Sequence, residues 1–208
     1  FINNIAIYPA YINKYTIPFI LLISFFGGIN EAITNFLNSM GGTSKVLLGI
    51  IVAGMMSIDM GGPFNKAAYV FGTASLASGN YEVMAAVMAG GMVPPLAIAL
   101  ASTFFKNKFT KRERQSALTN YIMGLSFITE GAIPFAAADP LRVIPSCVIG
   151  SATAGALTML FNCELRAPHG GIFVLPVIGN PLGFLGAVVI GSLVGMIMLA
   201  LLKKKVVE

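Results

Sequence analysis

Charged residues are scarce in this chain of 208 residues. Only 10% of the residues are charged and 56% are hydrophobic, whereas a soluble domain usually carries about a quarter charged residues. A soluble fold of this length could not bury so much apolar surface, so most of the chain is predicted to lie in lipid. Three uncharged stretches are long enough for a helix to cross a bilayer. They are residues 83–105, 143–163 and 182–202.

Cysteine and histidine are also rare, which limits the chemistry. Cys147 and Cys163 form no CxxC motif and lie in or at the end of one apolar span. We expect them to be small packing residues rather than a disulfide or a metal site. The one histidine, His169, has no His, Cys or carboxylate partner at metal-ligand spacing. We therefore expect no metal site and no cofactor.

Basic residues outnumber acidic ones, 13 to 8, but they do not indicate nucleic-acid binding. Five of them lie in the loop 106–114 and three in the tail 203–205, each beside an apolar span. Short basic segments beside such spans face the cytoplasm by the positive-inside rule. We predict a multi-pass membrane protein with a cytoplasmic loop 106–114 and a cytoplasmic C-terminus.

Other apolar segments are interrupted. Residues 16–40 form a span broken at Glu31, residues 46–81 are broken by DMGGPFNK, and residues 115–142 are broken after Glu130. If 115–142 enters and leaves on one side, the basic loop and the tail share a side, so a re-entrant hairpin at about 115–142 is favoured. Irregular backbone at membrane depth needs protein or a water-filled cavity around it. The predicted fold is all-α, a polytopic membrane protein with broken helices.

Glu130 is the strongest candidate for a functional residue. A charged side chain within an apolar segment is costly and is a functional hypothesis by default. A carboxylate at the break FITEGAIP can accept two sugar hydroxyls or remove a proton as a general base. The alternatives are that it caps the hairpin turn or pairs with Arg142. Glycines in AGG, GSATAG and IGSLVG are expected to serve helix packing.

Three further segments carry polar side chains at breaks. In DMGGPFNK, Asp59, Asn65 and Lys66 either line a binding cavity or form a solvated turn with Asp59 as a helix cap; the segment lacks the GxxxxGK[ST] phosphate loop. His169 in APHGG is either a structural residue or a donor to a substrate hydroxyl. Asp139 and Arg142 can pair three residues apart, but Pro140 favours an N-cap role for Asp139.

Four of these stretches, in this order, resemble one family. DMGGPFNKAAYVFG (59–72), AAVMAGGMVPPLAIALA (85–101), FITEGAIPFAAADPLRVIPS (127–146) and LRAPHGGIFVLP (165–176) are similar to the fructose-type enzyme II C component of the bacterial phosphoenolpyruvate-dependent sugar phosphotransferase system. The resemblance runs from about residue 30 to the end. The chain opens at Phe1 without Met, so we expect residues 1–208 to be the C-terminal part of a single transmembrane domain.

The resemblance implies a sugar permease. A protein of this family carries fructose or a similar sugar across the membrane. A phosphocysteine on the cytoplasmic IIB component phosphorylates the sugar, and a IIA component is a further partner. In the wider superfamily the glutamate of the ITE motif binds the sugar hydroxyls near the one that is phosphorylated, which assigns that role to Glu130. His169, Asp59, Asn65 and Lys66 are further candidates for sugar contacts. Arg142 would pair with a carboxylate or meet the phosphoryl group.

The resemblance also implies a homodimer formed through N-terminal helices that this sequence lacks, and without them we expect the fragment alone to be inactive. Neither Cys147 nor Cys163 matches the phosphocysteine of a IIB component. Two other functions remain open: an ion-coupled secondary transporter with Glu130 or Asp59 as the proton carrier, and a membrane interaction subunit that transports nothing.

Overall fold

The computed structural model describes residues 45–206, and this part of the chain folds into helices. The apolar runs predict helices, because a helix satisfies its own backbone hydrogen bonds in lipid. The α-helices and 3-10 helices (η) are α3 (Lys45–Met55), α4 (Pro63–Ala77), α5 (Tyr81–Phe104), η1 (Lys106–Lys108), α6 (Lys111–Leu125), η2 (Thr129–Ala132), α7 (Ile133–Ala138), α8 (Pro140–Leu160), η3 (Gly171–Val177) and α9 (Pro181–Leu202). The span expected at 16–40 lies outside the described residues.

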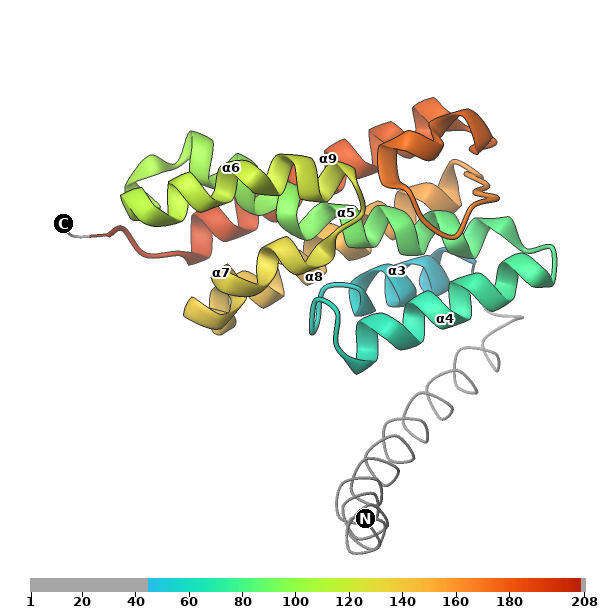
Figure 1. The fold of residues 1–208 in the computed structure, drawn as a ribbon, viewed down its shortest axis with the longest axis horizontal. Coiled ribbons are helices and arrows are strands. Elements are labelled where there is room, and N and C mark those ends of the chain that lie inside the picture. Colours follow the sequence, from blue (N-terminus) through green and yellow to red (C-terminus); the bar gives the residue numbers. More distant parts are fainter. Residues whose placement is uncertain (1–44, 207–208) are drawn as a thin grey trace, which may run out of the picture.

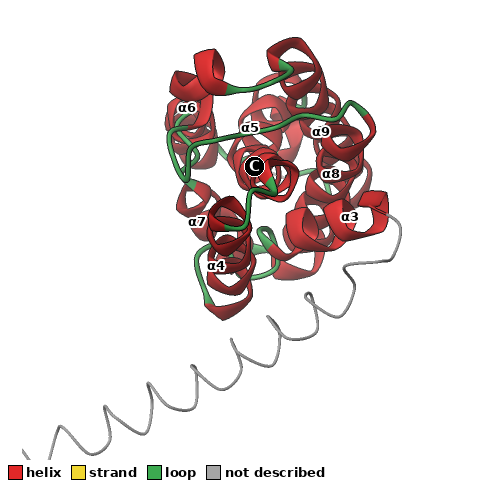
Figure 2. Ribbon diagram, turned by 90° about the vertical axis from the view of Figure 1, so that its right-hand side faces the viewer, coloured by secondary structure: helices red, strands yellow, loops and turns green. Residues whose placement is uncertain are grey.

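The three uncharged stretches form the longest helices. α5, α8 and α9 are each long and apolar enough to cross a membrane, as predicted. α5 and α9 run in one direction and α8 in the other (Figure 1). Within the most apolar 18 residues of each helix, 89% are buried in α5 but only 39% in α9. α5 is therefore the centre of the bundle, surrounded by the other helices (Figure 2), and α9 lies at its outside.

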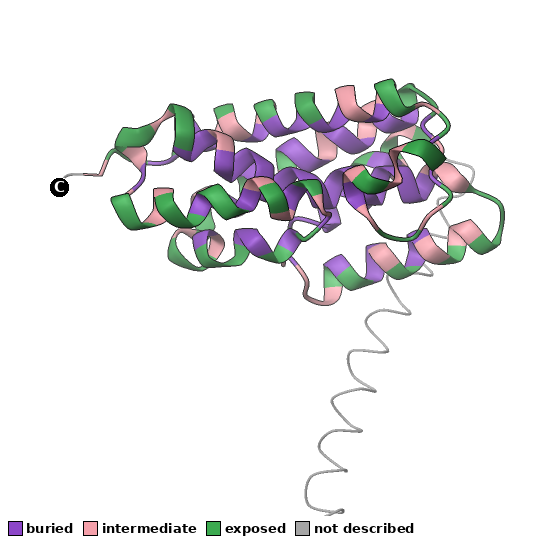
Figure 3. Ribbon diagram, turned by 45° about the horizontal axis from the view of Figure 1, so that its top comes forward, coloured by how far each residue is buried: buried purple, intermediate pink, exposed green. Residues whose placement is uncertain are grey.

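The long helices touch along glycines. Gly150 of α8 faces Gly191 and Gly195 of α9, and Gly155 of α8 faces Gly49 of α3. A Cβ added to Gly150 would lie 2.7 Å from the carbonyl oxygen of Gly191, well inside van der Waals contact. The backbones approach so closely that only glycine fits, which confirms the packing role expected for GSATAG and IGSLVG. Buried positions gather along the middle of the bundle and exposed ones on its outer helices (Figure 3).

The first broken segment turns back halfway along α5. α3 begins beside the N-terminal end of α5, where Lys45 pairs with Glu82. It reaches the middle of α5, where Ala53 contacts Gly90. α4 then returns to the end at which α3 began (Figure 1). The turn between α3 and α4 thus lies beside the middle of α5 rather than at an end of the bundle.

The second broken segment turns back from the opposite end. α6 starts at Lys111, four residues before the predicted start of the hairpin, and its Gly124 packs on Leu96 and on the carbonyl oxygen of Met92 in the middle of α5. η2 and α7 return toward the end at which α6 began, and α8 starts there at Pro140 (Figure 1). Both ends of 115–142 lie at one end of the bundle, which is the arrangement that a re-entrant hairpin requires.

The basic loop and the C-terminal tail pack together. Lys203 is only 9% exposed, forms an ion pair with Glu113 at 3.2 Å and lies over the ring of Phe109. The Val206 N–H donates to the carbonyl of Asn107 at 2.9 Å. Two clusters of positive charge that the sequence separates by about half its length therefore share one end of the bundle. We call it the basic end.

Asp139 corrects one expectation. It occupies the N-cap position of α8, as Pro140 predicts, but its side chain makes no capping hydrogen bond. Both carboxylate oxygens instead accept from Arg142 Nη1 at 3.0 Å. The N-cap role was wrong and the pairing was right, because a charged guanidinium is a stronger partner than a backbone N–H. Cys147 and Cys163 are buried and unpaired, in keeping with a packing role.

Candidate functional site

The two turn-backs meet at Glu130. Gly61, in the turn between α3 and α4, has a φ of +116°, and a Cβ there would lie 3.1 Å from Glu130 Oε1. Residues with a side chain rarely adopt this φ, so glycine lets the backbone of one tip approach the carboxylate of the other. Glu130 is exposed, and its side chain forms no hydrogen bond or ion pair within residues 45–206. Its carboxylate oxygens are available to hydroxyl donors.

A proline in α5 provides the anchor for the segment that carries Glu130. Pro95 has no N–H, so it leaves the carbonyl oxygen of Gly91, four residues earlier, without its helical donor. The hydroxyl of Thr129 donates to that oxygen at 3.1 Å, and Thr129 is 3% exposed. A buried carbonyl without a donor is costly, so this hydrogen bond ties the residue before Glu130 to the middle of α5.

The preceding proline of α5, Pro94, has a similar hydrogen bond nearby. Pro94 leaves the carbonyl oxygen of Gly90 without a donor, and the hydroxyl of Ser151 in α8 donates to it at 2.7 Å. Ser151 is fully buried and also shares a hydrogen bond with Ser57, just beyond α3. α5 continues as a helix through both prolines because hydroxyl groups from neighbouring segments replace the two missing N–H groups.

Aromatic side chains line the same region. Phe127 has a φ of +62° and is buried, an uncommon backbone for a bulky residue. Its ring packs on Gly91, where a Cβ would overlap it. The ring centroid lies 5.2 Å from that of His169, at an interplanar angle of 60°, and 6.3 Å from that of Tyr69. The APHGG loop therefore reaches the tip that carries Glu130, and His169 is exposed there.

The residues of DMGGPFNK have mixed roles. Asp59 accepts the N–H groups of Phe64 at 2.7 Å and Asn65 at 2.9 Å, so its carboxylate caps the first turn of α4. The side-chain amide of Asn65 donates to the carbonyl of Met56 at 2.8 Å, which holds the turn together. Lys66 is exposed. A direct role of these three residues in ligand binding stays a prediction.

Arg142 stands apart from Glu130. It lies in the first turn of α8, at the other end of α7, and pairs with Asp139. Among the described residues it forms no ion pair with Glu130, so that alternative is not observed. The segments DMGGPFNK, FITEGAIP and APHGG thus meet around Glu130, whereas Arg142 lies away from them at the start of α8. The candidate site consists of a carboxylate, an imidazole and aromatic rings.

Comparison with known proteins identifies the family. Residues 12–150 match the family model described as "Phosphotransferase system, EIIC". The chain belongs to this family. EIIC proteins are membrane components of a sugar phosphotransferase system, so the three apolar helices belong to a membrane protein. No solved structure matches the chain.

Several relatives of this chain are named as fructose-specific proteins. The chain is 58% identical to the "PTS system fructose-specific EIIABC component" of Bacillus subtilis (strain 168), over 85% of this chain and 28% of that protein. It is 58% identical to the "Fructose permease IIC component" of Bacillus amyloliquefaciens, over 85% of this chain and 58% of that protein. With the "PTS system fructose-specific EIIB'BC component" of Escherichia coli (strain K12) it shares 50% identity, over 87% and 33%. The chain spans between about a quarter and three fifths of these relatives.

Sequence reasoning did not single out Thr129, Ser151 or Phe127. The double proline of MVPPLA was a usable signal, since two consecutive prolines in a predicted helix leave two carbonyl groups without donors. The sequence could not show which hydroxyls replace them. Thr129 comes from a segment 38 residues away and Ser151 from one 61 residues away.

Proposed function

We propose that the full-length protein carries fructose or a similar sugar across the membrane and presents it for phosphorylation. The observation that carries this proposal is the position of Glu130, where two turn-backs meet beside the middle of α5. Among residues 45–206 its carboxylate has no hydrogen-bond or ion-pair partner. A charged group at such depth is costly unless a polar ligand or a wet cavity accompanies it. The fructose-specific names of the relatives support the sugar.

Glu130 would hold and activate the reacting hydroxyl. Its two oxygens can accept hydrogen bonds from two sugar hydroxyls, or one can take the hydroxyl proton as a general base. The sugar oxygen then forms a bond to phosphorus while the bond between phosphorus and the cysteine sulfur of the IIB component breaks. His169, beside Phe127 and exposed, is placed to donate to a neighbouring hydroxyl. Asp59 and Asn65 would fix the shape of the turn that holds Gly61, and the exposed Lys66 would be free to contact the sugar.

The phosphocysteine belongs to a partner. The names EIIABC and EIIB'BC associate A and B components with the relatives, and we propose cytoplasmic IIA and IIB components as partners here. A homodimer formed through N-terminal helices would involve residues outside 45–206, and the mass of the full-length protein in detergent would test it. Arg142, at the basic end, is a candidate to meet the phosphoryl group once its pair with Asp139 opens.

The product of transport tests the proposal. In vesicles that hold the full-length protein and its phosphorylated B component, labelled fructose is expected to appear inside only as a sugar phosphate. Vesicles without the phosphoryl donor are the control and should accumulate no phosphate ester. Free fructose accumulating against its gradient in response to an ion gradient would instead establish the secondary transporter. No uptake and no phosphorylation of any sugar by the complete system would favour the interaction subunit.

The basic end is proposed to face the cytoplasm of a bacterial inner membrane, with the C-terminus on that side. Single cysteines test this, in a full-length background without other cysteines: Lys204→Cys at the basic end and Arg166→Cys in the loop after α8. In intact cells a membrane-impermeant maleimide is expected to label Arg166→Cys at once and Lys204→Cys only after permeabilisation. The reverse pattern would contradict the orientation. Both positions are exposed.

A further inference from the structure

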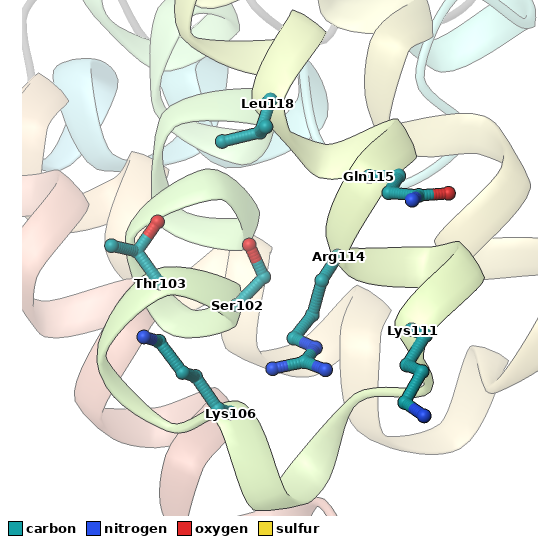
Figure 4. A pocket seen from close by; sticks show the side chains of 7 residues that line it. All are labelled: Ser102, Thr103, Lys106, Lys111, Arg114, Gln115 and Leu118. Atoms are coloured by element: carbon teal, nitrogen blue, oxygen red, sulfur yellow. The ribbon is translucent and has the colours of Figure 1, made fainter.

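A cationic cavity lies at the basic end, away from Glu130. Its volume is about 510 Å³ and it opens between the end of α5, η1 and the first turns of α6 (Figure 4). It is lined by Ser102, Thr103, Lys106, Lys111, Arg114, Gln115 and Leu118. Three of these residues are cationic and none is acidic. Their positive charges converge on one cavity, where they attract an anion more strongly than separate charges in solvent would.

The nearby acidic residue does not neutralise this cavity. Glu113 is turned away from it: one carboxylate oxygen pairs with Lys203 and the other accepts the N–H of Thr110 at 2.8 Å, in the capping box of α6. Between residues 45 and 206, Lys106, Lys111 and Arg114 form no ion pair. The three cations therefore remain available to an anion from outside the described chain.

Arg114 adds a second observation. Its guanidinium extends into the space between α5 and Lys111 (Figure 4). The Nε–H of Arg114 is buried and has no hydrogen-bond acceptor within residues 45–206. A buried donor without an acceptor is unfavourable, and a phosphate oxygen is an acceptor whose geometry suits a guanidinium. The hydroxyls of Ser102 and Thr103 both donate to the carbonyl oxygen of Ala99, and within residues 45–206 neither accepts a hydrogen bond from the Arg114 side chain.

An apolar stripe leads away from the cavity along α6. Leu118 lines the cavity and is 60% exposed, and the stripe continues one and two turns further with Ile122 and Leu125, which are 72% and 37% exposed. The spacing of four and three residues puts all three side chains on one face of the helix. Cations at one end and an exposed apolar face running toward the middle of the bundle complement a molecule with an anionic head and a hydrocarbon chain.

We propose that this cavity binds the phosphate group of an anionic phospholipid, with an acyl chain along Leu118, Ile122 and Leu125. Basic pockets between helices at a membrane edge suit phospholipid head groups, and the volume exceeds what inorganic phosphate alone would fill. A phospholipid and a soluble phosphate ester both carry the phosphate group that the cations would bind. Only the phospholipid has an acyl chain that could cover the apolar stripe. The proposal does not depend on the proposed sugar transport, because the residues that line the cavity are not among those placed around Glu130.

The test uses the full-length protein in a neutral detergent and measures binding by native mass spectrometry. The probes are short-chain phosphatidylglycerol, its diacylglycerol counterpart without phosphate, and glycerol phosphate without chains. Phosphatidylglycerol is expected to bind, and Arg114→Gln or Lys111→Gln should weaken it by about tenfold. Lys204→Gln, an exposed cation of the same end outside the cavity, is the matched control and should bind normally. Leu118→Gln should weaken the binding of phosphatidylglycerol but not that of glycerol phosphate. Leu201→Gln, on the exposed face of α9, should change neither.

Four results would overturn the proposal. The first is equal loss of binding in Lys204→Gln and Arg114→Gln, which would indicate diffuse charge attraction. The second is binding of glycerol phosphate as tight as that of the lipid, which would make the ligand a soluble phosphate ester. The third is unchanged lipid binding in a folded Lys111→Gln, a variant at an exposed position. The fourth is loss of B-component binding in these variants without any effect on lipid, which would make the cavity a protein docking site.

Discussion

Replacing Glu130 with glutamine in the full-length protein is expected to lower the rate of fructose phosphorylation roughly 10²- to 10⁴-fold, the usual contribution of a general base. Glutamine keeps the size of the side chain and one acceptor oxygen but cannot take a proton. The loss should therefore fall mainly on the maximal rate, with a smaller rise in the KM for sugar. Glu130→Asp, which withdraws the carboxylate by one methylene, should retain part of the rate.

The matched control for Glu130 is Glu164→Gln. Glu164 is also a carboxylate in the described region, but it pairs loosely with Arg166 at 3.4 Å in an exposed position after α8. Its loss should leave uptake and phosphorylation near those of the unaltered protein. Fructose uptake by vesicles with the phosphorylated B component measures both variants. A Glu130→Gln protein that phosphorylates fructose at the normal rate would exclude Glu130 from the reaction.

Replacing Thr129 with valine is expected to raise the KM for sugar and to destabilise the protein by about 1–3 kcal/mol. Valine matches threonine in shape but removes the hydroxyl that donates to the carbonyl oxygen of Gly91, and an unpaired buried acceptor costs about that much. Without this bond the segment that carries Glu130 loses its attachment to α5. Thr129→Ser, which keeps the hydroxyl, should restore both properties.

A second substitution separates positioning from stability. Pro95→Ala introduces an N–H four residues after Gly91, so α5 itself can supply the missing donor. In the double variant Thr129→Val, Pro95→Ala the thermal midpoint should recover. The KM for sugar should stay high, because no hydrogen bond ties the side chain at position 129 to α5. If the KM recovered together with the midpoint, Thr129 would be a structural residue and its positioning role would be wrong.

The neighbouring proline supplies the control. Ser151→Ala removes the donor to the carbonyl of Gly90, and Pro94→Ala should compensate for it in the same way. Ser151 lies in α8 and is not part of the segment that carries Glu130. Its loss should therefore lower the thermal midpoint with little change in the KM for sugar. Equal effects of Ser151→Ala and Thr129→Val on the KM would show that any loosening of α5 disturbs the site.

The amino-acid sequence alone is enough to predict which segments lie in lipid and which do not. The three uncharged runs became α5, α8 and α9, because twenty apolar residues without a charge suit helix in a bilayer. The breaks at DMGG and at FITEGAIP were equally readable, since glycine, proline and a carboxylate oppose a continuous apolar helix. These signals are local, so no partner helix had to be known.

The use that is made of each break depends on how the helices pack. Asp59 and Glu130 are both carboxylates at breaks. Asp59 accepts hydrogen bonds from the first turn of α4, whereas Glu130 faces the turn at Gly61. Asp139 could have capped α8 or paired with Arg142, and it pairs. The choice depends on which donors packing brings within about 3 Å, and segments remote in sequence supply the donors of Gly90 and Gly91. A sequence pattern shows that a carbonyl in α5 lacks its N–H; the packing of the bundle decides that Thr129 replaces it.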